Sequence, residues 1–243
     1  MKNMKNIYTN TFNLRTSDFN CNNSISPAAV LDLFQEVAGA HAEELSCGFV
    51  KMLEKKQLWV VVRAKFKMLK QIEYHTPVTV TTWPLAPSRI GFQREYKITD
   101  RHGDTAVIGS TDWVVMHSEE RRLLPVSDIY PADMEYIGEK VFDGRNKKLH
   151  DNSETEYIYS LTPQYSDIDL NGHVNNAKYA EFIMDALKLD TTELIDEMQI
   201  DFHRELKRGE EVKIFAHRQE KEIFIKGQNP QDETSFTCRI ILK

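Results

Sequence analysis

Cysteine is scarce in this 243-residue sequence, and long apolar runs are missing from it. The three cysteines, Cys21, Cys47 and Cys238, are odd in number, widely separated and without metal-ligand spacing, which favours reduced thiols over a disulfide framework. The longest apolar run, Leu58 to Val62, is far shorter than the roughly 20 residues that cross a bilayer. The first residues contain no apolar stretch of the kind that forms a signal-peptide core. We therefore expect a cytoplasmic protein without a membrane-spanning helix.

An excess of basic charge is also missing, since the formal net charge is -6 at pH 7. A nucleic-acid partner needs a basic surface, so none is expected. The sequence has neither a glycine-rich phosphate loop nor a dinucleotide fingerprint, and we expect no cofactor. It also lacks the Gly-x-Ser-x-Gly turn of many serine hydrolases. The eight histidines show no ligand-like local spacing, so we predict no metal site.

The composition that remains is typical of a globular protein, with 41% hydrophobic and 28% charged residues. Ser26 followed by Pro27 predicts the start of a helix, because apolar residues recur after it at helical spacing. Over residues 62–68 the pattern changes to alternation, which predicts a half-buried strand with Val62 and every second residue after it on the buried face. Further strands are expected at residues 78–83, 91–99 and 105–116.

The same order of elements returns after residues 118–156, a stretch without sustained periodicity that we interpret as a linker. Beyond it we expect a loop over residues 169–173 and a helix over about 175–187. Four strands should follow, at residues 199–206, 212–219, 222–227 and 234–242. The sequence therefore predicts an α+β protein of two similar halves, each with one long helix and an antiparallel sheet.

The loops before the two long helices suggest a duplication. Residues 18–22, Asp-Phe-Asn-Cys-Asn, can be laid against residues 169–173, Asp-Leu-Asn-Gly-His, so that the Asp-x-Asn frame recurs and the histidine does not. Aligning the first long strand of each half sets Leu69 roughly opposite Glu205. We therefore expect the first-half loop to have kept its shape and lost its reactive groups.

Four polar residues of the second half could form a catalytic site. Asp169, Asn171 and His173 alternate in a loop directly before a helix, where free backbone amides and the helix dipole favour negative charge. Glu205 is expected on a later strand, within reach of the same cavity. A histidine, a carboxylate and an amide in such a place suit hydrolysis of an activated acyl group. Taken alone, such loop residues are more often turn formers and caps, and a lone strand glutamate is more often a solvated charge.

The run at residues 169–179, Asp-Leu-Asn-Gly-His-Val-Asn-Asn-Ala-Lys-Tyr, with Asp-Phe-His-Arg-Glu at 201–205, resembles the acyl-acyl carrier protein (acyl-ACP) thioesterases of plants and bacteria. The first half is similar to that family at 83–84, 91–96, 113–116 and 121–123, so the resemblance covers nearly the whole chain. It implies a double (tandem) hotdog fold, in which each half wraps an antiparallel sheet around one long helix. The expected division is a catalytically degenerate, acyl-binding hotdog at residues 1–117, the linker at 118–156 and a catalytic hotdog at 157–243.

Carried over residue by residue, the family's catalytic groups become Asp169, Asn171, His173 and Glu205. The resemblance implies hydrolysis of the fatty acyl-ACP thioester by water activated at Glu205, with His173 and Asn171 orienting the reactants and Asp169 holding the loop and tuning His173. Which of Glu205 and His173 is the general base stays open. Many plant members carry cysteine directly after the glutamate, whereas this chain has Leu206, which excludes a thiol nucleophile there.

Cys21 and Cys47 have no paired histidine at readable spacing, and we expect both to be buried, inert thiols. The expected partner is an acyl carrier protein, which is acidic and would need a local basic patch. The two candidate patches are Arg63, Lys65, Lys67 and Lys70, and Arg145, Lys147 and Lys148. Acyl-coenzyme A hydrolysis and non-catalytic acyl sensing stay open as alternative functions, as do the preferred chain length and a homodimer. No membrane partner is expected.

Overall fold

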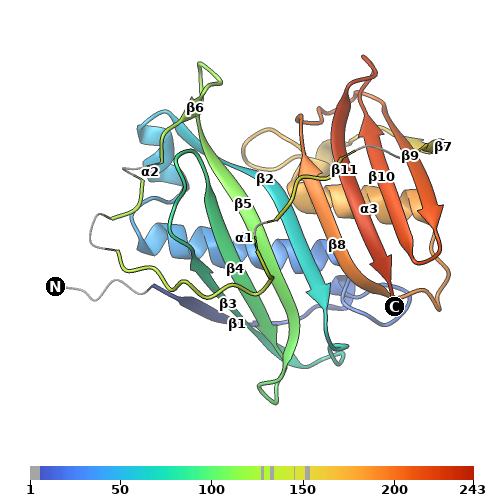
Figure 1. Ribbon diagram of the computed structural model, residues 1–243, viewed down its shortest axis with the longest axis horizontal. Helices are drawn as coiled ribbons and strands as arrows, with labels where there is room; N and C mark the ends of the chain where they lie inside the picture. The colour runs from blue at the N-terminus through green and yellow to red at the C-terminus, as the bar shows by residue number, and fades with distance from the viewer. Residues whose placement is uncertain (1–5, 127–128, 132–133, 145, 151–153) are drawn as a thin grey trace.

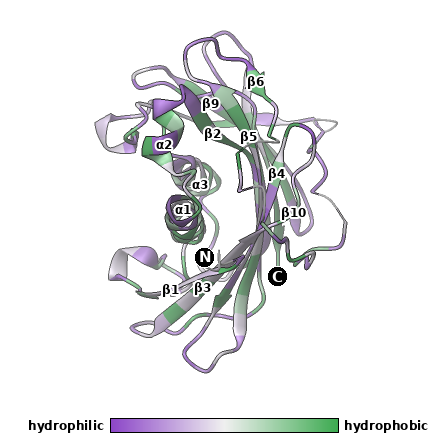
Figure 2. Cartoon of the chain, turned by 90° about the vertical axis from the view of Figure 1, so that its left-hand side faces the viewer, coloured by the Kyte–Doolittle hydropathy of each residue, from purple (hydrophilic) through white to green (hydrophobic). Residues whose placement is uncertain are grey.

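The computed structural model describes residues 6–126, 129–131, 134–144, 146–150 and 154–243. Its strands form an eleven-stranded antiparallel sheet, and two long helices lie side by side against one face of that sheet (Figure 1, Figure 2). Each half thus wraps an antiparallel sheet around a long helix, as predicted for a double hotdog. No helix in the described part of the chain has the length and apolar character needed to cross a membrane.

The elements follow the same order twice along the chain. Those of the first half are β1 (Tyr8–Asn13), the 3₁₀ turn η1 (Thr16–Asp18), α1 (Pro27–Glu44), α2 (Phe49–Glu54), β2 (Gln57–Met68), β3 (Pro77–Pro84), β4 (Phe92–Thr99), β5 (Thr105–His117) and β6 (Leu123–Leu124). Those of the second half are β7 (Glu156–Leu161), the 3₁₀ turn η2 (Tyr165–Asp167), α3 (Asn176–Leu187), β8 (Ile195–Phe202), β9 (Val212–Gln219), β10 (Glu222–Gln228) and β11 (Thr234–Leu242). The sheet order is β1-β3-β4-β5-β2-β8-β11-β10-β9-β7, with β6 beside β5.

Both long helices begin at the capping residues that the sequence predicts. The Ser26 hydroxyl accepts a hydrogen bond from the Ala29 amide at 3.1 Å, and Pro27 opens α1. Asn175 caps α3 in the same way, since its side-chain oxygen accepts from the Ala177 amide at 2.8 Å. The helices then fill the space against the concave face of the sheet, where the main apolar core lies.

The halves meet where β2 pairs with β8, from Arg63 opposite Asp201 to Lys67 opposite Glu197. A bulge between Val61 and Arg63 shifts the alternation of β2 at this point. Val61 is therefore buried and Val62 is only half-buried, so the prediction that placed Val62 on the buried face is wrong. The bulge also brings the apolar start of β2 to the wall of the cavity described below.

Four of the described strands and α-helices were not expected from the sequence, among them the two-residue strand β6 beside β5. The strands β1 and β7 lie at the two edges of the sheet, and α2 is a helix of six residues. The strand predicted at residues 199–206 also extends too far at its C-terminal end, because β8 ends at Phe202 and Glu205 lies in the loop that follows. The prediction of Glu205 on a strand is therefore wrong.

Val126 and Tyr130 of the predicted linker pack in a cluster with Ala42 of α1. The later described part, residues 139–144 and 146–149, lies across the sheet face opposite the helices (Figure 1, Figure 2). It is held there by hydrogen bonds between its backbone and side chains of the sheet. The Val141 amide donates to Glu95 Oε2 at 2.8 Å, and the Leu149 amide donates to Asp201 Oδ2 at 2.9 Å. The Arg63 guanidinium donates to the Asn146 carbonyl at 3.0 Å. The division at residues 117 and 156 stays a prediction.

Candidate active site

The loop before α3 is built around Asp169. Its Oδ1 accepts hydrogen bonds from the backbone amides of Asn171, at 2.8 Å, and His173, at 3.3 Å. Its backbone amide donates to the His173 carbonyl at 2.8 Å, and its Oδ2 accepts from the Asn171 side-chain amide at 3.3 Å. Gly172 lies between them at a φ of +78°, a conformation that favours glycine. Asp169 therefore holds the loop shape, and its contact with His173 is made to the backbone.

The second segment of the site is the loop after β8, which carries Glu205. The next residue, Leu206, is almost fully buried, and its backbone amide donates to the hydroxyl of Tyr179 in α3 at 3.1 Å. Tyr179 packs its ring edge-on against Phe202 and Phe236, which fixes its hydroxyl beneath the loop. Burial raises the pKa of Tyr179, so this hydroxyl stays protonated at neutral pH.

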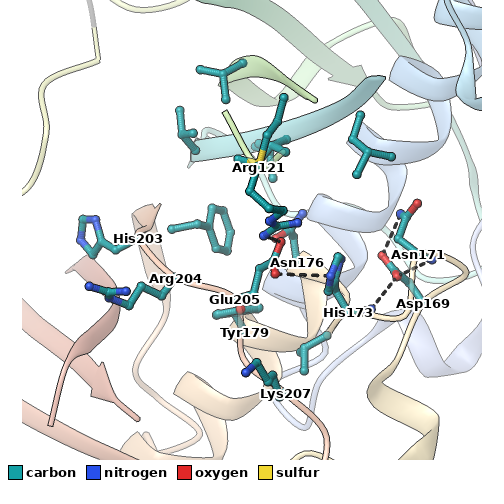
Figure 3. Close-up of a pocket in the computed structure, with 18 of the residues that line it drawn as sticks. Arg121, Asp169, Asn171, His173, Asn176, Tyr179, His203, Arg204, Glu205 and Lys207 are labelled. Atoms are coloured by element: carbon teal, nitrogen blue, oxygen red, sulfur yellow. Dashed lines mark hydrogen bonds and ion pairs between the residues drawn. The ribbon is translucent and has the colours of Figure 1, made fainter. Parts of the chain in front are cut away.

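His173 and Glu205 come together from these two loops. The distance from His173 Nε2 to Glu205 Oε2 is 3.3 Å, and the two side chains are 35% and 34% exposed. The other carboxylate oxygen, Oε1, lies 2.6 Å from Nη2 of Arg121, which comes from the first half of the chain. Asp169 and Asn171 lie on the side of His173 away from Glu205 (Figure 3). Of the four predicted residues, His173 and Glu205 thus contact each other directly. Asp169 and Asn171 are linked to His173 through the hydrogen bonds of the loop.

These side chains lie on an open cavity of about 550 Å³ between the two halves. The first half contributes an apolar wall, made by residues 58–62 of β2 with Val114 and Met116 of β5. Asn176, at the start of α3, lines this cavity and also a second, small one of about 20 Å³ beneath α1. Val61 and Phe202 line both as well, so these three residues lie between the larger cavity and the small one.

Two site residues were missed by the sequence analysis. Arg121 was part of a family-like run, but nothing local links it to a residue 84 positions further along the chain. Tyr179 could have been found from helical spacing, because it lies three residues after Asn176 and therefore on the same face of α3. Among the described residues, no group of three or more His, Cys, Asp or Glu side chains could hold a metal ion.

The burial of the cysteines agrees with the prediction for Cys47 but not for Cys21. Cys47 is buried, and burial raises its pKa to about 11, so it is a protonated, inert thiol at neutral pH. Cys238 is also buried, with its pKa raised by the same cause. Cys21 is exposed, so the prediction of a buried thiol there is wrong. Leu206 offers no thiol next to Glu205.

The first half contains a loop with the same hydrogen bonds as the loop around Asp169. The Asn20 amide donates to the Ser24 carbonyl at 2.9 Å, as Asp169 does to His173, and Asn20 Oδ1 accepts from the amides of Asn22 and Ser24. The bridges Phe19–Ile25 and Ile168–Val174 match as well. Asn20, Asn22 and Ser24 therefore correspond to Asp169, Asn171 and His173, so the predicted alignment is wrong by two positions.

The first-half residue that corresponds to Glu205 also differs from the predicted one. Gln71 lines a pocket of about 80 Å³ with the first-half loop, and the residue after it, Ile72, is as buried as Leu206. Gln71, rather than the exposed Leu69, thus corresponds to Glu205. Its side chain donates to the Asn23 carbonyl at 2.8 Å. Neutral amides and a hydroxyl stand where the second half has its ionisable groups, which supports the expectation of a degenerate first-half site.

One of the two predicted basic patches is neutralised by neighbouring carboxylates. Each of its four cations has an acidic partner within 3.3 Å. The pairs are Arg63 with Asp112 and Asp201, Lys65 with Glu197, Lys67 with Asp196, and Lys70 with Asp100 and Asp104. In the second patch Lys147 and Lys148 are exposed, while Arg145 lies outside the described residues. The first patch is thus a poor docking surface for an acidic protein.

Comparison with known proteins gives a family for both halves. The family model described as the acyl-ACP thioesterase N-terminal domain matches residues 5–134, and that of the C-terminal domain matches residues 150–240. The chain belongs to the acyl-ACP thioesterase family. This family member is 29% identical over 217 residues to the chloroplastic palmitoyl-acyl carrier protein thioesterase of Arabidopsis thaliana, and 26% identical over 225 residues to the oleoyl enzyme of Coriandrum sativum.

These alignments cover 83% and 84% of this chain, but only 53% and 61% of the two plant proteins. The chain thus spans little more than half the length of these relatives. Its fold matches the acyl-ACP thioesterase of Bacteroides thetaiotaomicron over 100% of both chains, with a TM-score of 0.88 and 22% identity. The 12:0-ACP thioesterase of Umbellularia californica matches 98% of both chains, with a TM-score of 0.83 and 20% identity. At these identities the likeness shows the double hotdog fold.

Proposed function

We propose that this chain hydrolyses the thioester of fatty acyl-ACP and releases a free fatty acid. The observation that carries the proposal is the 3.3 Å approach of His173 Nε2 to Glu205 Oε2 at the mouth of a cavity with an apolar wall. An acid/base pair of this kind can activate water, and the apolar wall suits a fatty chain. The names of the plant relatives, which specify palmitoyl- and oleoyl-acyl carrier protein, support the substrate class.

The acyl chain would pass from the open mouth between Val61, Asn176 and Phe202 into the apolar space beneath α1. These are the residues that the two cavities share. The cavity beneath α1 is small, so the chain would need neighbouring side chains such as Phe34 to move aside. The thioester carbonyl would then lie near the N-terminus of α3, where backbone amides favour developing negative charge.

In the proposed reaction, water lies between Glu205 and the thioester carbon. Glu205 takes a proton from the water, and His173 moves a proton toward the leaving sulfur, or the two exchange these roles. Asp169 keeps the loop in shape through its bonds to the Asn171 and His173 amides. Asn171 is exposed on the same cavity and would turn its amide toward the substrate when the carrier binds. No thiol intermediate is needed.

The test is release of free fatty acid and free thiol from a series of acyl carrier protein substrates, with the coenzyme A equivalents run beside them. Glu205→Gln and His173→Ala should each lower kcat by about 10²- to 10⁴-fold, because each removes a positioned proton-transfer group. Glu181→Gln is the matched control, since this glutamate lies on α3 and pairs with Lys178. Circular dichroism should show all variants folded.

The two alternative functions predict different results in this assay. Faster release from coenzyme A substrates would identify an acyl-coenzyme A thioesterase with the same catalytic residues. Acyl binding without release from either series would identify a non-catalytic sensor and contradict the proposal. The acyl carrier protein as partner, a homodimer and a cytoplasmic location remain predictions; gel filtration and light scattering would test the homodimer.

A further inference from the structure

Glu205 is held from the other half of the molecule. Arg121 Nη2 lies 2.6 Å from Glu205 Oε1, while Glu205 Oε2 faces His173 at 3.3 Å, so the two oxygens of this carboxylate have different partners (Figure 3). A guanidinium that donates to a carboxylate at this distance makes a strong, directional hydrogen bond. We infer that Arg121 is a positioning residue, which holds one oxygen of Glu205 so that the other points at His173. This inference rests on the proposed role of Glu205 in thioester hydrolysis.

The turn that carries Arg121 is tightly fixed. Arg121 lies in the hairpin between β5 and β6, where its amide donates to the His117 carbonyl at 3.0 Å. Its φ of +55° is uncommon for a residue with a side chain, and it turns Arg121 away from the strand direction. The same hairpin is tied to the start of β2 by the Ser118 amide, which donates to the Lys56 carbonyl at 2.8 Å. A fixed turn at the rim of the cavity is suited to present a side chain in a set position.

The next arginine provides an internal comparison. Arg122 pairs with Glu120 within the same hairpin, whereas Arg121 reaches a carboxylate in the second half. Their side chains are similarly exposed, and exposed ion pairs contribute little to the free energy of unfolding. Stabilisation of the fold therefore does not distinguish the two arginines. What distinguishes Arg121 is that its partner is the acid of the catalytic pair.

The kinetic test uses Arg121→Gln, Arg121→Lys and the matched control Arg122→Gln, with an acyl carrier protein substrate that the wild type hydrolyses. We expect Arg121→Gln to lower kcat by about 10- to 100-fold, as misplacement of a catalytic group by an ångström does, with KM changed less than about threefold. Arg121→Lys should recover part of kcat, because it restores a cation without the planar fork. Added guanidinium ion should partly rescue Arg121→Gln and leave Arg122→Gln unchanged, an effect that a purely structural role would not produce.

A double variant shows whether Arg121 acts through Glu205. In the Glu205→Gln background, Arg121→Gln should cause little further loss of kcat, since the group that it positions is gone. An unchanged kcat with a raised KM in Arg121→Gln would overturn the inference and make Arg121 a docking residue. Equal losses in Arg121→Gln and Arg122→Gln would overturn it as well.

Crystal structures of the wild type and Arg121→Gln give a readout that does not depend on activity. We expect Glu205 Oε2 to stay within hydrogen-bond distance of His173 Nε2 in the wild type and to turn away in the variant. An unchanged Glu205 in the variant would contradict the inference even if the chain proves to be a thioesterase. A wild type without thioesterase activity but with the expected movement of Glu205 would instead contradict the proposed function alone.

Discussion

At the scale of single residues, the site depends on what lies directly behind its reactive groups. Glu205 is one third exposed, yet its neighbour Leu206 is almost fully buried, and the hydroxyl of Tyr179 accepts the hydrogen bond of the Leu206 amide. This contact places the end of the Glu205 loop against α3, the helix that follows the His173 loop. The 3.3 Å distance between His173 and Glu205 is therefore set in part by a tyrosine that bonds to the residue after Glu205.

Replacing Tyr179 by phenylalanine tests this arrangement. Tyr179→Phe keeps the ring packing but leaves the Leu206 amide buried without its partner, which should lower the free energy of unfolding by about 1–3 kcal/mol. The loosened loop should also lower kcat by about tenfold, with a smaller effect on KM. Urea unfolding and steady-state kinetics measure the two effects. Tyr165→Phe is the control, because Tyr165 is 79% exposed; equal changes in both variants would count against the role of the hydroxyl.

The sequence predicted that Glu205 lies within reach of the cavity next to His173, but not how the two side chains are held. Asp169, Asn171 and His173 could be predicted because they lie within five residues, where hydrogen bonds are short-range and leave a readable motif. Arg121 and Tyr179 reach Glu205 and Leu206 across the fold, and such contacts depend on the packing of the two halves. The duplication was visible, but its register was not, because backbone hydrogen bonds rather than side-chain identity define the two loops.

At the scale of elements, the linker is part of the sheet's structure rather than a free connection. Its backbone amide at Val141 donates to Glu95, a carboxylate on β4 with no exposed surface. Glu95 also accepts from Ser110 and Gln93, both at 2.9 Å, so each of its oxygens is used. Burial is the largest influence on this group and raises its pKa, although these hydrogen bonds oppose the shift.

The raised pKa of Glu95 makes the free energy of unfolding depend on pH. Because the folded-state pKa of Glu95 lies above its ordinary value of 4.5, its contribution to stability is fully present below about pH 4.5 and is lost as pH rises through the folded-state pKa. Glu95→Gln does not titrate, so the wild type minus variant difference in the free energy of unfolding should shrink as pH rises from 4.5 to 7.5. The slope should not exceed about 1.4 kcal/mol per pH unit. Urea unfolding at several pH values measures it, with the exposed Glu44→Gln as control. A difference that grows with pH would contradict the assignment.

The elements that the sequence did not reveal share a physical cause. The edge strand β1 alternates Thr and Asn with only Tyr8 and Phe12 as large apolar residues, since an edge strand packs less of its surface than a central one. Beyond β6, the linker has no periodicity because its backbone bonds to distant side chains rather than to a neighbouring strand. By contrast α1 and α3 have their backbone hydrogen bonds within the helix, and β3, β4, β5, β9, β10 and β11 each pair with a strand that is next to them along the chain, so their patterns were readable.

At the scale of the whole molecule, the two halves share a sheet, a core and a site. The β2–β8 junction has Arg63 in a bidentate ion pair with Asp201, at 2.7 and 3.0 Å, on the face beneath the linker. On the opposite face, Phe66 and Met198 are buried in the common core. Separating the halves would expose both strands as open edges and would remove Arg121 and the β2 wall from the cavity that His173 and Glu205 line. We therefore expect the chain to unfold as a single cooperative unit.

The distribution of tryptophan makes this expectation testable. Trp59, Trp83 and Trp113 are the three tryptophans of the chain and all lie in the first half, so their fluorescence reports on that half, whereas far-UV circular dichroism reports on both. In urea the two signals should change at the same midpoint. Asp201→Asn, a change in the second half, should lower both midpoints together and the free energy of unfolding by about 1–3 kcal/mol, because it weakens the bond to Arg63 across the junction. Asp232→Asn, in the β10–β11 turn, is the control and should move neither. If Asp201→Asn shifts only the circular dichroism transition and leaves the tryptophan signal in place, the halves unfold separately and the junction does not couple them.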